Sequence, residues 1–244
     1  MKHNYKKFAF TMAEMMVCLA VVSVLATILI PSMRSIRPDR SKTMFKKAYG
    51  VAEKVVYEMI NNSEWYPATD IFVGFDNTKV VTINGVEYGT LQEPEIVYPE
   101  GATEEQKEEL RAQARAEVDE KAKRKFCQLF ATEVNKISAV SCKSHNAPAA
   151  GGAFEPSFVT SDGVWWLMPH SDFAPYQNYQ SIWIDVNGSE KPNVIDIAGP
   201  ASECPDNSTA DIFEIQVRAD GKMRANGRCA QRYMNDMNLM RNRM

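Results

Sequence analysis

The chain has 244 residues, of which 45% are hydrophobic and 24% are charged, so it is long and apolar enough to fold a domain with an ordinary core. Its formal net charge is -3 at pH 7, which implies no strongly basic face, and nucleic acid is therefore not a favoured partner. The sequence contains no G-x-S-x-G, P-loop or H-E-x-x-H motif, and its three histidines are scattered, so it offers no support for catalysis.

The first predicted element is an apolar segment that contains one charge. Between Phe8 and Ile30 the only charged residue is Glu14, and the segment ends at Pro31. A basic leader precedes it, with Lys2, Lys6 and Lys7. A run of about 20 apolar residues is long enough to cross a bilayer as a helix. A lone carboxylate in hydrocarbon is costly, so Glu14 needs a partner or a function.

Two ordinary interpretations of this segment are open. It could be a secretory signal peptide, with a basic start and an apolar middle, although no clear small-x-small cleavage site follows it and Glu14 interrupts it. It could also be a plain signal anchor, because its length and hydropathy suffice for one membrane-spanning helix.

The details of the segment favour a third interpretation. The stretch from Lys6 to Glu14 reads KKFAFTMAE, and it resembles the N-terminus of type IV prepilins and type II secretion pseudopilins. In that family a basic leader ends in a small residue, which is followed by a Phe, a Thr-Leu-x-Glu run, a long apolar helix and a Pro. Here Ala9 occupies the small position in place of the usual Gly, Phe10 is the new N-terminus, and Pro31 lies seventeen residues beyond Glu14, at the family's place.

The resemblance implies a pathway of processing and assembly. A prepilin peptidase would cut between Ala9 and Phe10 on the cytoplasmic face of the inner membrane, and Phe10 would be N-methylated. The carboxylate of Glu14 would neutralise the new amine, within one helix or between subunits, where the pairing would set the axial register because a buried unpaired acid is costly. Inner-membrane lipid would surround the helix first, and other pilin or pseudopilin subunits would do so in the fibre.

Beyond Pro31 the apolar spacing becomes that of an amphipathic helix over residues 32–62, whose apolar stripe should lie against a sheet. Residues 10–62 are therefore predicted to form one long helix, kinked near Pro31. Six basic residues follow the apolar run: Arg34, Arg37, Arg40, Lys42, Lys46 and Lys47. The positive-inside rule alone would place the N-terminus outside, whereas the motif and the cysteines favour an extracytoplasmic C-terminal domain.

Two further elements are predicted in the middle of the chain. Strands at residues 79–83 and 86–91 flank an Asn-Gly pair, which indicates a two-residue β-hairpin. Residues 103–137 have the composition of a highly charged helix, with Thr103 and Gln106 in a capping box. Charges of mixed sign favour a solvated structural helix, and a partner-binding helix is the alternative.

The C-terminal half consists of predicted strands joined by turns. The strands are expected at residues 164–168, 181–186, 212–217 and 222–225. Residues 143–157 are rich in Gly and Pro and indicate a loop, and residues 233–244 show no clear period and are predicted to fray. Together with the resemblance, these elements predict an α+β, pilin-like fold in which a long N-terminal helix packs on a small antiparallel sheet.

Five cysteines are present, and the four that lie beyond the apolar segment can pair in three ways. Their order along the chain favours the pairs Cys127–Cys142 and Cys204–Cys229, and none has the C-x-x-C spacing of a zinc or thioredoxin-like site. Disulfides would place the domain in an oxidising compartment, with free thiols as the alternative. Cys18, within the apolar segment, is interpreted as a small apolar filler.

One turn in the C-terminal half raises the question of a metal. Asp185, Asn187 and Gly188 form a D-x-N-G sequence, followed by a Pro-Asn pair, in an order that resembles certain bacterial pilin-like proteins. Asp185 and Asn187, with Asp196 nearby, could supply oxygen ligands to calcium, which some pseudopilins bind. The complete EF-hand pattern is absent, so the competing interpretation is a turn shaped by side-chain hydrogen bonds, with no cofactor.

These features predict a structural subunit of a type IV pilus or a type II secretion pseudopilus, and its size and charged insertion favour a minor pilin or pseudopilin. The expected layout is a leader at 1–9, a transmembrane and filament-core helix at 10–31, its amphipathic continuation at 32–62, and an extracytoplasmic domain at 63–244 with a helical insertion at about 103–137. The chain is expected as a single-pass inner-membrane protein and then in the fibre. The alternative is a membrane-anchored, extracytoplasmic binding protein that never polymerises.

Overall fold

The structure is a computed structural model, and it describes residues 12–35, 40–67, 74–75, 77–89, 96–144, 147–148, 155–170, 173, 179–206 and 208–241. The chain divides into two compact units, residues 1–40 and 41–244. The first unit contains α1 (Met12–Ser35), a helix of 24 residues that continues through Pro31. Residues 36–39 lie outside the described residues, so one continuous helix over residues 10–62 stays a prediction.

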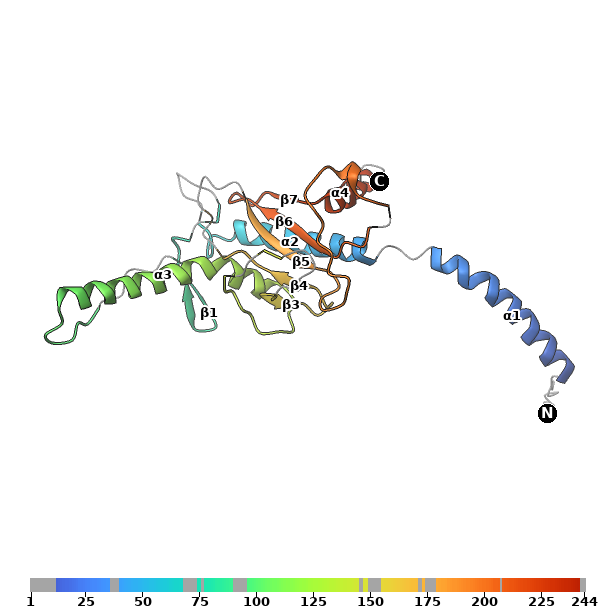
Figure 1. The fold of residues 1–244 in the computed structure, drawn as a ribbon, viewed down its shortest axis with the longest axis horizontal. Helices are drawn as coiled ribbons and strands as arrows, with labels where there is room; N and C mark the ends of the chain where they lie inside the picture. Colours follow the sequence, from blue (N-terminus) through green and yellow to red (C-terminus); the bar gives the residue numbers. More distant parts are fainter. Residues whose placement is uncertain are drawn as a thin grey trace, which may run out of the picture. The chain divides into compact units, whose positions relative to one another are not determined.

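The second unit begins with α2 (Arg40–Asn61), whose apolar stripe is buried as its spacing predicts. The buried side chains are Phe45, Ala48, Tyr49, Ala52, Val55, Val56 and Met59. The centroid of the Phe45 ring lies 4.7 Å from that of Phe213 in the main sheet. The helix therefore packs against the sheet, as expected (Figure 1).

The main sheet has five antiparallel strands in the order β3-β4-β5-β6-β7. They are β3 (Phe158–Val159), β4 (Trp165–Leu167), β5 (Gln180–Asp185), β6 (Ile212–Val217) and β7 (Met223–Ala225). The strands predicted from the sequence are confirmed with small changes at their ends, and β3 is an addition, because two residues carry no detectable alternation. A separate hairpin, β1 (Val81–Ile83) and β2 (Val86–Tyr88), turns at the predicted Asn-Gly pair.

Alternate side chains of the main sheet face opposite sides. On one side Trp166, Ile184 and Phe213 are buried in the main core. On the other side Leu167 and Ile212 are buried in a second, smaller cluster, against which Trp165, Trp183 and Ile195 pack. The segment that leads from β5 to β6 therefore covers part of the outer face, and this is the segment that contains the predicted calcium turn.

The charged helix is confirmed as α3 (Glu104–Glu133), with both hydrogen bonds of the capping box between Thr103 and Gln106. Its two halves differ in burial. Phe126, Leu129 and Phe130, in the C-terminal half, are buried in the core, whereas the N-terminal half is exposed or half-exposed. The apolar end of α3 therefore anchors the helix, and the charged end extends away from the sheet (Figure 1).

The prediction of a frayed C-terminus is wrong over most of its length. Residues 228–241 form the helix α4 (Arg228–Arg241), which follows a 3₁₀ turn, η1 (Ala201–Glu203), and the strand β7. The sequence of α4 has a weak apolar period, and contacts with distant residues hold its start. The described molecule is thus an α+β protein with an N-terminal helix and antiparallel sheets.

Candidate functional site

The helix α1 presents apolar side chains that its own chain leaves uncovered. Every described side chain from Met12 to Leu25 is exposed, and Met12, Leu19 and Leu25 have exposed fractions of 87%, 62% and 53%. A contiguous apolar surface of this length is unfavourable in water. It is the surface of a helix that lipid or other helices cover.

Glu14 lies in the first turn of α1 and is exposed. A carboxylate there interacts favourably with the positive end of the helix dipole. Ala9 and Phe10, the predicted cleavage site, lie outside the described residues, so cleavage and methylation stay predictions. Within the described part of the chain, no helix is at once long enough and apolar enough for a membrane span.

Both predicted disulfides are confirmed. Cys127 at the buried end of α3 is bonded to Cys142, with 5.8 Å between their Cα atoms. Cys204, after η1, is bonded to Cys229 in the first turn of α4, with 4.8 Å between their Cα atoms. Each bond joins a helix to an irregular segment that lacks a strand ladder of its own. Cys18, in α1, is a free and exposed thiol.

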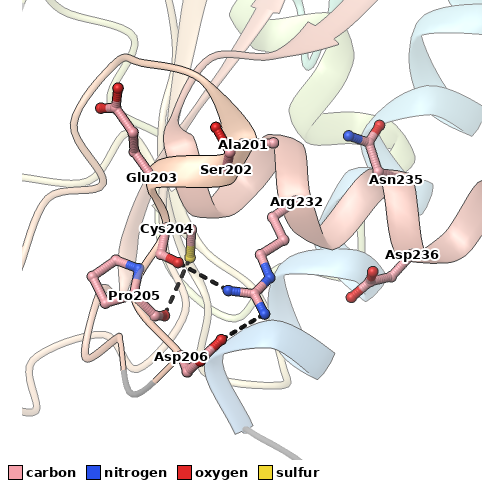
Figure 2. Close-up of a pocket in the computed structure, with 9 residues that line it drawn as sticks. All are labelled: Ala201, Ser202, Glu203, Cys204, Pro205, Asp206, Arg232, Asn235 and Asp236. Carbon is pink, nitrogen blue, oxygen red and sulfur yellow. Dashed lines mark hydrogen bonds and ion pairs between the residues drawn. The ribbon is translucent and has the colours of Figure 1, made fainter.

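A polar hollow of about 650 Å³ lies beside the Cys204–Cys229 disulfide, between η1 and α4 (Figure 2). Arg232 crosses it, donating from Nη1 to the carbonyl of Cys204 at 2.9 Å and from Nη2 to the carboxylate of Asp206 at 2.7 Å. At its rim Asp236 accepts from Lys42 of α2 at 2.6 Å, and this hydrogen bond lowers the pKa of Asp236. These contacts hold α4 against the disulfide loop and α2, which is a structural arrangement.

Asp196, a predicted calcium ligand, serves a different purpose at the start of α4. Its Oδ1 accepts from the N–H of Cys229 at 3.1 Å and its Oδ2 from the N–H of Ala230 at 2.7 Å. Burial raises the pKa of Asp196 despite these donors. A Cβ on Gly227 would lie 2.1 Å from Asp196 Oδ2, so the residue before α4 must be a glycine. The helix is thus capped by a carboxylate from about thirty residues away in the chain.

The turn after β5 is built around Asp185. Its Oδ1 accepts from the N–H groups of Asn187 at 3.1 Å and Gly188 at 2.9 Å, which is the hydrogen-bonded turn of the competing interpretation. Burial raises the pKa of Asp185 to about 7, and the nearby charge of Asp211 adds to the shift. Asp211 in turn accepts from the side chain of Asn187 at 2.8 Å and from the N–H of Asn193 at 2.8 Å.

The structure thus brings Asp185, Asn187, Asn193 and Asp211 together, and engages Asp196 at α4 instead. The Oδ1 atoms of Asn187 and Asn193 are buried without a hydrogen-bond partner in the described structure. No three His, Cys, Asp or Glu side chains among the described residues are grouped so as to hold a metal ion. The known partners of these carboxylates are N–H donors, which a cation would have to displace or avoid, and calcium stays a prediction.

Two functional interpretations of polar side chains find structural answers. Lys125 is fully buried in α3, donates to the carbonyls of Trp65 at 2.8 Å and Lys79 at 2.7 Å, and lies 4.2 Å from the centroid of the Tyr66 ring. Sequence reasoning missed it, because nothing distinguishes this lysine from others in a charged helix. His170 lies with its Nε2 atom 3.2 Å from Oε2 of Glu120, while its sequence neighbours Ser171 and Asp172 lie outside the described residues.

Comparison with known proteins bears on α1 and its leader. The model of the prokaryotic N-terminal methylation motif matches residues 4–30, a span that includes Ala9, Phe10 and Glu14. No curated protein and no solved structure matches the chain. Proteins with this motif are structural rather than catalytic, and the motif implies processing by prepilin peptidase and assembly with other pilin subunits. The chain therefore carries the prepilin-type signature of type IV pilins and pseudopilins.

Proposed function

We propose that the chain is a structural subunit, a minor pilin or pseudopilin, of a type IV pilus or a type II secretion pseudopilus. The observation that carries the proposal is the methylation motif over residues 4–30, which runs into a helix whose described side chains are exposed and almost all apolar. An apolar helix of this kind is stable in lipid and in a bundle of like helices, because both cover its surface. The same helix can therefore anchor the subunit first and form the fibre core later.

In this proposal the peptidase cuts between Ala9 and Phe10, and the amine of Phe10 is N-methylated. Glu14 lies four residues from the new positive charge, so its carboxylate can neutralise that charge in its own helix or in a neighbour. In the fibre core an unpaired carboxylate would be costly, so only the register that pairs Glu14 is stable. Glu14 is thus proposed as the residue that sets the register of assembly.

The domain at 63–244 would face the extracytoplasmic side, with α1 as a single-pass anchor in the inner membrane. Two disulfides support an oxidising compartment, because such bonds are rare where thiols are kept reduced. The roles found for its polar groups are structural: Lys125, Asp185 and Asp196 hold loops and helix ends. No catalytic role is proposed for it.

The first test is intact-mass measurement and N-terminal sequencing of the full chain, produced with and without a prepilin peptidase. We expect a mature chain that begins at N-methyl-Phe10 only when the peptidase is present. An Ala9→Leu variant is the control, since a bulky residue at the cleavage position should block processing. A start at Met1 in every sample would instead identify a plain signal anchor, and a cut beyond residue 30 would identify a secreted protein.

The second test separates a fibre subunit from a membrane-anchored protein that never polymerises. The Glu14→Ala chain should be processed normally but recovered in membranes rather than in sheared fibres. Glu14→Gln, which keeps the shape and removes the charge, should show the same loss. Unchanged fibre yield in both variants would contradict the proposed role of Glu14.

A further inference from the structure

The exposed end of α3 is strongly acidic. Among residues 100–109 the acidic side chains are Glu100, Glu104, Glu105, Glu108 and Glu109, and all of them are exposed. Lys107 pairs with Glu104 at 2.7 Å, and Arg111 pairs with Glu108 at 3.4 Å. Glu100, Glu105 and Glu109 have no ion pair to another described residue. This helix face therefore carries negative charge that its own domain does not neutralise.

A hollow of about 460 Å³ lies beside this acidic face. Pro99, Ala102 and Leu110 give it apolar walls, and Glu109 lies at its edge. Lysine and arginine side chains bury an aliphatic stem and keep the charged group in water. The combination of an apolar hollow and a carboxylate edge therefore fits a basic side chain of a partner.

The first two turns of α2 have the opposite charge. Residues 40–47 read RSKTMFKK and include no acidic side chain. Lys42 pairs with Asp236 at 2.6 Å and Lys47 with Asp162 at 2.9 Å. Burial lowers the pKa of Lys46, and the charge of Lys42 lowers it further, with only partial compensation from Asp236. This end of the domain therefore has an excess of positive charge that an acidic partner would relieve.

The two charged surfaces lie at opposite ends of the domain. In Figure 1 the start of α2 lies near α4, and the start of α3 lies at the far end of the same unit. They cannot meet within one chain in this fold. A two-fold pairing of either surface with itself would place like charges together. A contact between opposite ends of two copies is heterologous, and contacts of that type build open helical fibres when they do not close into a ring.

We propose that the acidic face at the start of α3 docks on the first two turns of α2 in a second copy of this chain, so that the domains meet head to tail; this rests on the proposed function as a fibre subunit. The contact orients each incoming subunit, while the apolar helices hold it. Ion pairs at an exposed surface are individually weak and are screened by salt, so the contact selects partner and register more than it binds.

Charge reversal with rescue tests the contact in the full chain, assembled in membranes with a prepilin peptidase and its assembly machinery. Reversal of the acidic face by Glu105→Lys with Glu109→Lys should lower fibre yield by about tenfold, because like charges then meet. Lys46→Glu alone should also lower it. The three changes together should recover most of the yield, which a folding defect in either surface would not allow.

The matched control reverses two other exposed acids, Glu133→Lys with Glu155→Lys, so that the net charge changes equally away from the start of α3; its yield should stay normal. A second measurement is oxidative cross-linking of Glu105→Cys with Lys46→Cys in a Cys18→Ala background, which should give a ladder of covalent multimers. Full assembly of the acidic-face variant, or loss without rescue and without a ladder, overturns docking on a second copy. Failure of the unmodified chain to be processed or to assemble overturns the proposed function itself.

Discussion

The helix α1 and the unit at residues 41–244 solve the problem of apolar surface in opposite ways. In the unit, α2 and α3 turn one apolar face each toward the sheet, and side chains such as Phe45, Phe130 and Phe213 are fully buried. In α1, every described side chain from Met12 to Leu25 is exposed. The unit is therefore complete as a folded body, whereas α1 depends on something outside its chain.

The polar residues show the same contrast. Lys125, Asp196 and Asp211 are buried in the unit with hydrogen-bond partners from distant parts of the chain. Glu14 of α1 lies on a helix with no core around it, where its proposed partner comes from a processed N-terminus. A buried charge in the unit stabilises a fold, and the lone charge of α1 is proposed to select an assembly. All four tryptophans lie in the unit, so their fluorescence reports its unfolding alone.

The strongest expected break of the unit's independence is the loss of Lys125. Lys125→Ala leaves the carbonyls of Trp65 and Lys79 without a donor and opens a cavity, so we expect a loss of about 3 kcal/mol in unfolding free energy. Denaturant unfolding followed by tryptophan fluorescence measures it. Lys121→Ala, one turn earlier on the same helix, should change stability by less than about 0.5 kcal/mol. Equal effects of the two variants would refute the buried role of Lys125.

The second test removes the bond between α4 and the loop after η1. Cys204→Ser with Cys229→Ser opens a loop with a sequence separation of 25 residues, and the expected loss of stability is about 3 kcal/mol. Thermal unfolding with and without reductant gives the same comparison in the unmodified chain. Cys18→Ser is the control, because this free thiol lies in α1 and its removal should leave the midpoint unchanged.

A smaller effect is expected where Asp196 caps α4. Gly227→Ala places a methyl group against the carboxylate and pushes it off the N–H groups of Cys229 and Ala230, so we expect a loss of about 1–2 kcal/mol. Gly50→Ala, in the middle of α2 with open space around it, should instead stabilise the unit by about 0.5–1 kcal/mol. Opposite signs for two identical substitutions would separate close packing from helix propensity, and a neutral Gly227→Ala would contradict the cap.

The smallest expected effect concerns pH. The pKa of Asp185 is raised from 3.8 to about 7, so the folded state holds this proton more tightly than the unfolded state does. Its contribution to stability is complete below pH 3.8 and is lost as the pH rises toward 7. Asp185→Asn keeps an acceptor for both N–H groups and should remove that slope, with a gain on the order of 1 kcal/mol at pH 7.

The pH experiment also tests calcium. A cation held by Asp185 favours the ionised carboxylate, so calcium would reduce the slope in the unmodified chain and leave Asp185→Asn unaffected. The control for pH is Asp220→Asn. The hydrogen bond from Arg218 lowers the pKa of Asp220 to about 2, so this group's contribution is lost only as the pH falls below the range in which Asp185 acts. An unchanged slope in Asp185→Asn would contradict the assignment.

Local signals in the sequence were sufficient for several elements. The Asn-Gly turn of the hairpin, the capping box at Thr103 and the apolar stripe of α2 each depend on residues within a few positions of one another, and each is confirmed. The pairing of the cysteines followed from their order along the chain. The prepilin-type motif is also local, because the peptidase reads a short stretch before any fold exists.

Tertiary structure decided the features that depend on distant residues. The helix α4 was missed because its cap, Asp196, and its disulfide partner, Cys204, lie far from it in sequence. Lys125 is buried because two carbonyls from other segments meet it, and no pattern around it shows this. The sequence by itself determined which surfaces are apolar or charged and where the chain carries its processing motif. Only the folded chain determined which charges are neutralised, because burial and pairing arise between segments that the sequence keeps apart.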